Sequence, residues 1–241
     1  MSLFKNRRQA GELLGRSLQT LPALQGMTDL LVVGLPRGGV PVAYEVAQKI
    51  GAGLDVLIVR KLGVPGHEEL AMGAIASGGI QVLNRDVLDS LSISEKEIEQ
   101  VAAQEEREIF RRNLLYRDGK PKINVRGKVV IVVDDGLATG STMRAAVQTL
   151  RKDQPKLLIV AVPVAPASIC QQLRRCVDEL VCLHTPENFL SVGLWYDEFE
   201  QTSDEEVREL LQSAKMLPKP VESSRIEGIS AKNVPSAELP V

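Results

Sequence analysis

Short apolar runs alternate with amphipathic segments along most of the chain. The runs Leu30 to Leu35, Leu54 to Val59 and Val129 to Val133 are typical of strands that are buried on both faces. Two later runs, Leu157 to Val162 and Glu179 to Leu183, fit the same pattern. Strands that alternate with helices predict an α/β fold, a mostly parallel twisted sheet with helices on both faces.

The segments between these runs have the spacing of helices or the composition of turns. Ser92 or Ser94, each followed by a glutamate three residues later, starts a charged helix that runs to about Tyr116. Gly63 to Glu69 is predicted to be a loop, and Ala71 to Leu83 to hold two short strands around Gly78-Gly79. The other predicted helices cover 3–21, Val40 to Ile50, Met143 to about Arg151 and Ala167 to Cys176.

The order of the elements suggests one domain with additions. Residues 1–217 are predicted to form this domain, with a core at about 30–185 and a helical insertion at about 92–117. Residues 1–28 and 185–217 would form a small hood over the core. The tail, 218–241, is rich in Pro, Ser, Lys and Glu, and it is predicted to be a mobile extension.

Composition narrows the classes of function. A net charge of −2 and an aromatic content of 3% argue against a basic, base-stacking surface, so we expect no nucleic-acid partner. Met1 to Gln9 lacks the apolar stretch of a signal peptide, and no apolar run has the length of a membrane helix. These features predict a cytoplasmic protein without a membrane partner. The three cysteines stand without a second ligand cluster, as structural thiols do.

The most informative segment follows the run Val129 to Val133. It begins with Asp134 and Asp135 and continues as a turn of small and hydroxylated residues before a helix. A helix start offers unpaired N–H groups and a favourable dipole to an anion. Carboxylates beside a phosphate are unfavourable unless they accept hydrogen bonds from hydroxyls or hold a cation. The segment therefore suits a sugar phosphate; the alternative is an ordinary capped helix after a buried strand.

At these residues the chain resembles the type I phosphoribosyltransferases, of which it would be an uncharacterised or divergent member. In that family the corresponding signature binds phosphoribosyl pyrophosphate (PRPP). The resemblance implies that Asp134 and Asp135 contact the ribose and serve catalysis. The residues implied to bind the 5′-phosphate are Ala138, Thr139, Gly140, Ser141 and Thr142.

Two further polar clusters are predicted to follow strands. The turn Arg37-Gly38-Gly39 can form an anion-binding concavity, although alone it would be an ordinary strand-to-helix turn. The resemblance implies that it binds pyrophosphate, with an unusual peptide geometry. Arg60 and Lys61 are implied to contact pyrophosphate too, the alternative being a solvated basic strand end.

The regions expected to enclose the site are less specific. The family has a mobile lid near Gly63 to Leu70, in which His67 is expected to be solvated. Trp195 and Tyr196 are candidates for stacking on a base in the hood, the alternative being a small satellite core. His184 is expected to be structural.

Taken together, the resemblance implies a phosphoribosyltransferase that uses PRPP and Mg²⁺, transfers the phosphoribosyl group to a nitrogenous base and releases pyrophosphate. The metal would be held mainly through PRPP and water, with Asp134 and Asp135 as candidate ligands. Ala138 stands where purine-salvage members carry an acid, which disfavours a hypoxanthine or guanine acceptor. The alternatives are a non-catalytic PRPP- or nucleotide-binding regulator and, less favoured, a phosphohydrolase. Such domains are often homodimers.

Overall fold

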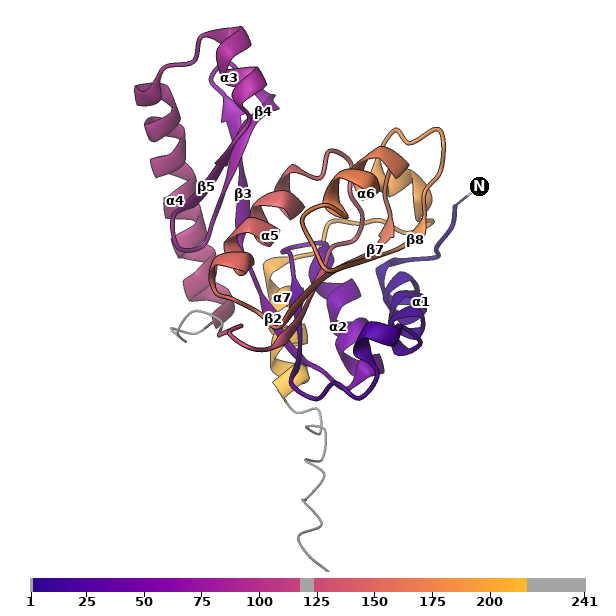
Figure 1. Cartoon of the computed structure of the whole chain (residues 1–241). Helices are drawn as coiled ribbons and strands as arrows, with labels where there is room; N and C mark the ends of the chain where they lie inside the picture. Colours follow the sequence, from indigo (N-terminus) through magenta and orange to yellow (C-terminus); the bar gives the residue numbers. More distant parts are fainter. Residues whose placement is uncertain (1, 118–123, 216–241) are drawn as a thin grey trace, which may run out of the picture.

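A five-stranded parallel sheet forms the centre of the molecule (Figure 1). The structure is a computed structural model that describes residues 2–117 and 124–215. The strand order is β2-β1-β6-β7-β8, and all neighbouring strands are parallel. The strands are β1 (Leu30–Gly34), β2 (Gly53–Val56), β6 (Val129–Val133), β7 (Leu157–Val164) and β8 (Glu179–His184). This arrangement confirms the predicted α/β fold.

Helices cover both faces of this sheet, and further helices lie outside it. The helix Asp204–Lys215 lies in the segment assigned to the hood and was not predicted. The helix that was expected to open at Ser92 or Ser94 opens after Ser94, whose hydroxyl and N–H form a reciprocal capping box with Glu97. The α-helices are α1 (Arg7–Gln19), α2 (Gly39–Ile50), α3 (Arg85–Leu91), α4 (Glu95–Arg117), α5 (Ser141–Lys152), α6 (Ala167–Leu173) and α7 (Asp204–Lys215).

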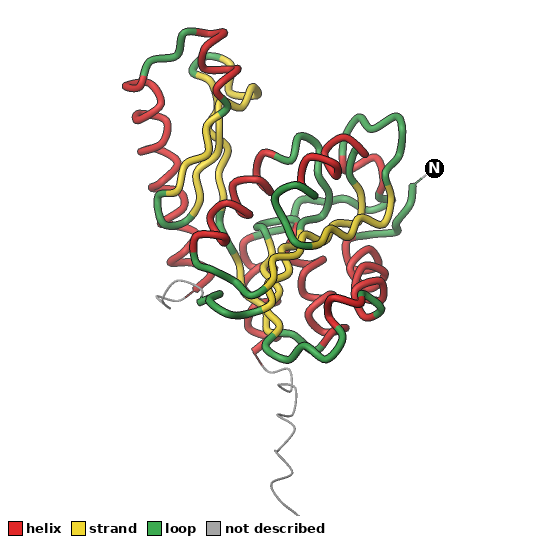
Figure 2. The backbone as a smooth tube through the Cα atoms, viewed as in Figure 1, coloured by secondary structure: helices red, strands yellow, loops and turns green. Residues whose placement is uncertain are grey.

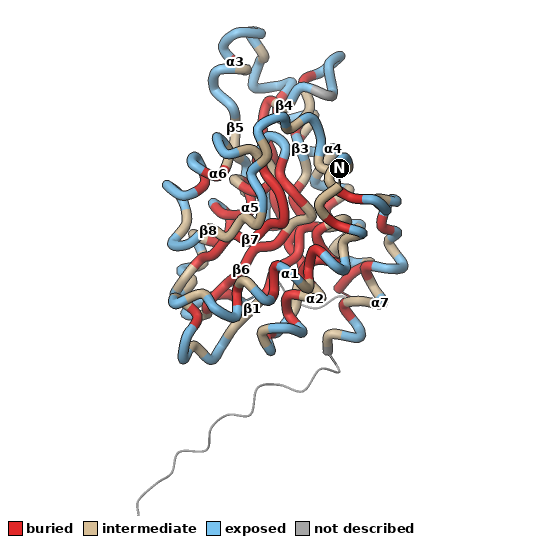
Figure 3. The backbone as a smooth tube through the Cα atoms, turned by 90° about the vertical axis from the view of Figure 1, so that its right-hand side faces the viewer, coloured by how far each residue is buried: buried red, intermediate tan, exposed pale blue. Residues whose placement is uncertain are grey.

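Successive side chains of the central strands enter two different apolar layers. In β6, Val130 and Val132 pack with the residues of α5 and α6, whereas Ile131 packs with those of α1 and α2. Because both faces are covered, β6 is fully buried, as its uninterrupted β-branched sequence indicates. Figure 3 shows this buried centre surrounded by more exposed helices and loops.

A second, antiparallel sheet corrects two predictions. Instead of one strand from Leu54 to Val59, β2 ends at Val56, and a new strand, β3 (Val59–Val64), begins after two buried residues. The expected loop at Gly63 to Glu69 is wrong, because β3 pairs with β4 (His67–Ala76) across a tight turn. Gly66 adopts a φ of 77° there, which suits the third position of a turn whose second position is proline.

The antiparallel sheet is completed by β5 (Ile80–Leu83), and the β4–β5 turn at Gly78-Gly79 confirms the predicted strand pair. Helix α4 packs on one face of this sheet and α5 on the other. Figure 1 and Figure 2 show β3 to β5 with α3 and α4 as an arm that rises from the central sheet. The arm therefore includes the predicted helical insertion.

Some predictions lie beyond what the structure addresses. The tail 218–241 lies outside the described residues. In residues 2–117 and 124–215, no helix combines the length and apolar character that crossing a bilayer requires.

Replacing Ile131 by alanine tests the role of the two-sided core. Ile131 is completely buried in the central strand, so Ile131→Ala should lower the free energy of unfolding by about 2–5 kcal/mol. Urea denaturation measures this change. The control Leu190→Ala, at a residue that is 82% exposed, should change stability by less than about 0.5 kcal/mol. Equal effects of the two substitutions would contradict the assigned core.

Candidate functional site

The carboxyl ends of β1 and β6 bring two of the predicted site segments side by side. Gly34 at the end of β1 pairs with Val133 at the end of β6, and the Leu35 N–H donates to the Val133 carbonyl at 3.0 Å. The turn that contains Arg37 therefore starts beside the carboxylate pair. This is the edge of an open parallel sheet at which ligands commonly bind.

The turn and the carboxylate pair are in such close contact that side chains larger than glycine would collide. A Cβ atom on Gly38 would lie 2.0 Å from Asp135 Oδ2, and one on Gly39 would lie 2.9 Å from Asp134 Oδ1. The two adjacent glycines thus permit an approach of the α2 N-terminus to the acidic pair.

The turn also presents backbone donors to this edge. The Pro36–Arg37 peptide bond is cis, an unusual geometry of the kind that the family resemblance implied. Gly39 N–H donates back to the Leu35 carbonyl. Within 2–117 and 124–215, the N–H groups of Arg37 and Gly38 have no such acceptor. Free N–H groups at a helix start can bind an anion.

The loop after β6 provides a second cluster of donors. Gly140, with a φ of 69°, is the N-cap of α5, and Ala138 and Thr139 are exposed. The Thr139 and Ser141 hydroxyls lie 3.2 Å apart, and Ser141 N–H is 3.4 Å from Thr139 Oγ1. Thr142 follows in the first turn of α5, so hydroxyls and first-turn amides gather at one helix end.

Asp135 has an arginine partner that the sequence patterns did not indicate. Arg7 Nε of α1 donates to Asp135 Oδ2 at 2.8 Å, and the two side chains are only 13% and 15% exposed. The Arg7 guanidinium also lies 3.8 Å from the Phe199 ring centroid and donates to the Glu200 carbonyl. The N-terminal helix and the segment after β8 are thereby joined at the acidic pair.

Asp134 and Asp135 differ in how their negative charge is compensated. Burial raises the pKa of Asp134 well above its usual range, and the adjacent charge of Asp135 raises it further. Burial also raises the pKa of Asp135, but the Arg7 guanidinium opposes that effect. Asp134 Oδ1 accepts the Asp135 N–H at 2.9 Å. Asp134 is therefore the carboxylate with the greater need of a ligand or cation.

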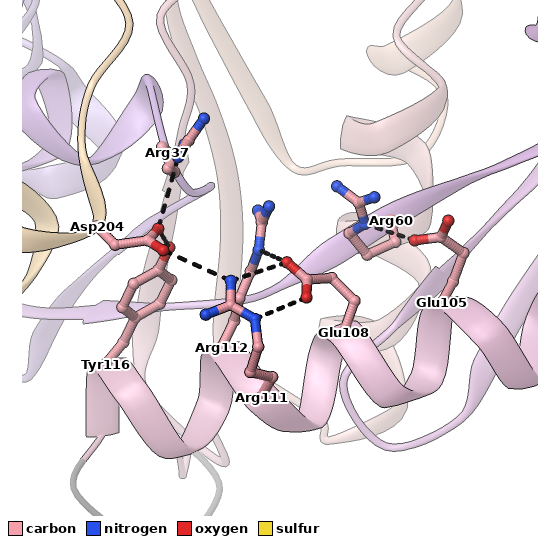
Figure 4. A network of polar contacts seen from close by, with 8 residues as sticks. All are labelled: Arg37, Arg60, Glu105, Glu108, Arg111, Arg112, Tyr116 and Asp204. Atoms are coloured by element: carbon pink, nitrogen blue, oxygen red, sulfur yellow. Dashed lines mark hydrogen bonds and ion pairs between the residues drawn. The ribbon is translucent and has the colours of Figure 1, made fainter.

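Arg37 belongs to a charged network that links the turn to α4 and α7 (Figure 4). Its guanidinium lies 3.7 Å from the Asp204 carboxylate at the start of α7. The same carboxylate accepts a hydrogen bond from the Tyr116 hydroxyl and lies 3.5 Å from Arg111. These contacts, which lower the pKa of Asp204, keep a permanent anion beside Arg37.

The structure separates Arg60 from Lys61. Both lie within β3, not at the end of a parallel strand as predicted, and neighbouring residues of a strand point to opposite faces. Arg60 contacts Glu105 of α4 at 2.6 Å. Lys61 is exposed and alternates with Arg60, which places it on the face that α5 covers. Only Lys61 therefore shares a face with the helix that begins at Ser141.

The hood candidates lie in an aromatic cluster. Tyr196 is buried between Phe4 and Phe199, with ring centroids at 5.3 and 4.9 Å, and its hydroxyl donates to the Asp135 carbonyl at 2.5 Å. Trp195 packs 6.1 Å from Phe189. These contacts agree with the satellite-core alternative, and the Tyr196 hydroxyl ties this cluster to the acidic pair.

The remaining candidates are peripheral. His67 is exposed at the start of β4, and the His184 ring packs edge-on against Phe4 at 5.6 Å. All three cysteines are free thiols. No group of three or more histidine, cysteine or acidic side chains suited to a metal occurs in the described part of the chain.

Arg7 and Asp204 are the site residues that sequence reasoning missed. Each reaches the site from an element more than sixty positions away in the chain, and neither belongs to a recognisable local motif. The only signal in the sequence was general: Asp204 opens an acidic Asp-Glu-Glu helix start, and Arg7 lies in a basic segment of the predicted hood.

The protein thus has an α/β fold, and at the sheet edge formed by β1 and β6 hydrogen-bond donors suited to an anion lie beside a carboxylate pair. Residues 8–194 match the family described as the phosphoribosyl transferase domain. The chain therefore belongs to the phosphoribosyl transferase domain family, which confirms the resemblance found in the sequence.

Particular relatives agree with this assignment. "Putative phosphoribosyl transferase Rv0571c" from Mycobacterium tuberculosis is 44% identical over 214 residues, which cover 89% of this chain but 47% of that protein. The chain thus spans about half the length of this relative. The "Bifunctional protein PyrR" of Clostridium acetobutylicum is 30% identical over 140 residues, or 57% of this chain and 58% of that protein.

A solved structure supports the fold. The crystal structure of TT1426 from Thermus thermophilus has a TM-score of 0.74 and is 39% identical. The match covers 88% of this chain and 99% of TT1426.

The raised pKa of Asp134 leads to a prediction about stability. Above pH 3.8, its usual pKa, the folded protein retains this proton more than the unfolded chain does, so stability falls as pH rises through the folded-state pKa. Asp134→Asn removes that loss. The variant should be more stable than the wild type at about pH 7, and the difference should shrink toward about pH 4.

Thermal unfolding across this pH range measures the effect. Asp89→Asn, which neutralises an exposed carboxylate, is the matched control and should leave the profile unchanged. An Asp134→Asn protein that is less stable than the wild type at neutral pH would contradict an uncompensated carboxylate.

Proposed function

We propose that this protein binds PRPP at the edge formed by β1 and β6 and transfers its phosphoribosyl group to a nitrogenous base, releasing pyrophosphate. The observation that carries the proposal is the contact between the Gly38-Gly39 turn and the Asp134-Asp135 pair. It joins donors for a pyrophosphate to acceptors for ribose hydroxyls. Family membership supports the same chemistry.

Each segment has a part in ligand binding under this proposal. The turn residues Arg37, Gly38 and Gly39 bind the pyrophosphate, and Lys61 adds charge from β3. Asp134 accepts hydrogen bonds from the ribose, while Asp135 is held in place by Arg7 and the adjacent backbone. The 5′-phosphate binds the hydroxyls and amides of the loop 138–142.

The residues also fit a magnesium ion that arrives with the substrate. Two carboxylates are adjacent. Of these two, only Asp135 forms an ion pair with an arginine within residues 2–117 and 124–215. With no third acidic ligand in that part of the chain, the ion would take most of its oxygen ligands from PRPP and water. Mg²⁺ would neutralise charge on the departing pyrophosphate.

The reaction would proceed by displacement at the anomeric carbon. A ring nitrogen of the base forms the new bond to this carbon as the bond to the pyrophosphate oxygen breaks, and pyrophosphate leaves with the electron pair. The ribose then has oxocarbenium character, which a nearby carboxylate such as Asp134 stabilises electrostatically. Catalysis therefore rests on positioning and charge.

A second candidate is a PRPP- or nucleotide-binding regulator without transferase activity. It is favoured by two observations. The Asp135 carboxylate already forms an ion pair with Arg7, and the Tyr196 ring is already packed between Phe4 and Phe199. A site with one neutralised carboxylate and a filled aromatic cluster could bind the phosphoribosyl donor yet lack a surface for a base.

Alanine substitutions at two glycines test the proposed phosphate loop. Gly140 and Gly127 have φ values of 69° and 71°, so alanine imposes similar backbone strain at both. Only at Gly140 would the new Cβ meet a neighbour, Ile169 Cγ2 at 2.8 Å. Gly140→Ala should weaken binding of PRPP with Mg²⁺ about tenfold or more, whereas Gly127→Ala should retain it.

Isothermal titration calorimetry provides the affinities. The proposal also requires Asp134→Asn to weaken PRPP binding. Failure of the wild type to bind PRPP with Mg²⁺ would refute the transferase and the PRPP-binding regulator, and would leave only a regulator that binds another nucleotide.

Turnover separates the transferase from the regulator. With PRPP, Mg²⁺ and a panel of purine and pyrimidine bases, the transferase should release pyrophosphate only when a suitable base is present. Asp134→Asn should reduce that rate by about tenfold or more, because the developing positive charge loses its nearby carboxylate. Binding of PRPP without base-dependent release would instead favour the regulator.

A further inference from the structure

A groove with a volume of about 440 Å³ lies between β3 and α4. Its lining is almost entirely charged. The residues are Arg60, Gln104, Glu105, Arg107, Glu108 and Arg111. Figure 4 shows Arg60 and Glu105 toward one end of this row and Arg111 nearer to Arg37.

The carboxylates of the groove are already shared among its arginines. Glu105 contacts Arg60 at 2.6 Å. Glu108 contacts Arg111 at 2.8 Å and also Arg112, one residue further along α4, at 2.6 Å. The hydrogen bonds from Arg111 are the main reason that the pKa of Glu108 falls to about 2. Both arginines therefore face a carboxylate that is ionised at neutral pH.

The cluster retains an excess of positive charge. Its four guanidinium groups, Arg112 included, and its two carboxylates leave a formal charge of +2. Arg107 has no ion-pair partner among the residues that the structure describes. Adding the neighbouring Arg37 and Asp204 adds one charge of each sign, so the excess remains +2.

The groove lies on a different face of the antiparallel sheet from the proposed PRPP loop. Arg60 alternates along β3 with Lys61 and points to the side of α4, as its contact with Glu105 shows. Helix α5, whose first turn forms part of the loop 138–142, packs on the other side. The sheet therefore stands between Arg60 and that loop.

We propose that this groove is a second anion site, which binds a small phosphorylated ligand of nucleotide size. The excess charge matches a phosphate dianion, and guanidinium groups can donate paired hydrogen bonds to phosphate oxygens. The volume lies within the range of pockets for small molecules, roughly 300–1,000 Å³. Gln104 adds an amide that can hydrogen-bond hydroxyls or a base.

Inorganic pyrophosphate without Mg²⁺ is the probe, and the Gly140→Ala protein, whose loop 138–142 is impaired, is the background. The turn Arg37-Gly38-Gly39 stays intact in this protein and can bind a pyrophosphate of its own. Isothermal titration should therefore show a pyrophosphate site whose affinity depends on Arg107 and Arg111, beside any pyrophosphate that binds at the turn. Adding Arg107→Gln and Arg111→Gln should weaken binding at this site by about tenfold or more. Arg107→Gln alone removes no ion pair within the described residues and should also weaken the binding of pyrophosphate. This single substitution keeps the test valid if the multiple variant fails to fold.

Arg16→Gln with Arg126→Gln is the matched control, since these two exposed arginines lie elsewhere and their loss changes the net charge equally. This pair should leave the affinity within about twofold. Equal weakening by the two pairs would overturn the proposal, as would a Gly140→Ala protein that binds no pyrophosphate. Tighter binding of a short single-stranded RNA than of pyrophosphate at about 0.15 M salt, lost with Arg107 and Arg111, would also overturn it.

The result is independent of the PRPP proposal. If PRPP fails to bind the wild type, pyrophosphate should still bind the groove of the Gly140→Ala protein. If PRPP binds but pyrophosphate does not respond to Arg107 and Arg111, only the groove proposal is wrong.

Discussion

The close approach of the Gly38-Gly39 turn to Asp134 and Asp135 is the constraint on which the candidate site depends. The parallel pairing of β1 with β6 fixes it, because Gly34 and Val133 end their strands together. With a Cβ at Gly38 only 2.0 Å from Asp135 Oδ2, any other residue would push the α2 N-terminus away from the acidic pair. Donors for an anion and acceptors for hydroxyls share one sheet edge because the two glycines bring no side chain of their own into this contact.

Burying two adjacent carboxylates is unfavourable, and the ends of the domain supply part of the compensation. Arg7 from α1 pairs with Asp135, while Tyr196, which follows β8, donates to the Asp135 carbonyl. Phe199 lies beneath the Arg7 guanidinium, so packing and charge compensation involve the same residues. The aromatic cluster near the N-terminus thus stabilises the acidic pair whether or not it also meets a base. Asp134, without an arginine of its own in the described structure, retains the unfavourable charge that a ligand could relieve.

The sequence predicted the elements that depend on local pattern, and it missed the contacts that depend on folding. The buried run of β6 and the loop 138–142 were recognisable because strand, turn and helix start are contiguous. The division of Leu54 to Val59 between β2 and β3 was not, since Leu57 and Ile58 are buried and continue the apolar pattern while the chain leaves one sheet for another. Arg7 could not be found from periodicity, because its partner lies 128 positions away.

That same crossing from one sheet to the other determines where the neighbouring cations Arg60 and Lys61 lie. In a parallel strand end both could have turned toward the ligand edge, but within β3 the alternation of side chains sends them to opposite faces. Arg60 thereby joins the charged side chains of α4 through Glu105. Another residue of α4, Arg111, shares the Asp204 carboxylate with Arg37. Because Arg37 and Arg111 share the Asp204 carboxylate, the energetic effects of removing the two arginines are not additive. When one arginine is removed, the other interacts more strongly with that carboxylate. Ion pairs thus connect the arm to the sheet edge, although the groove of the arm faces away from the loop 138–142.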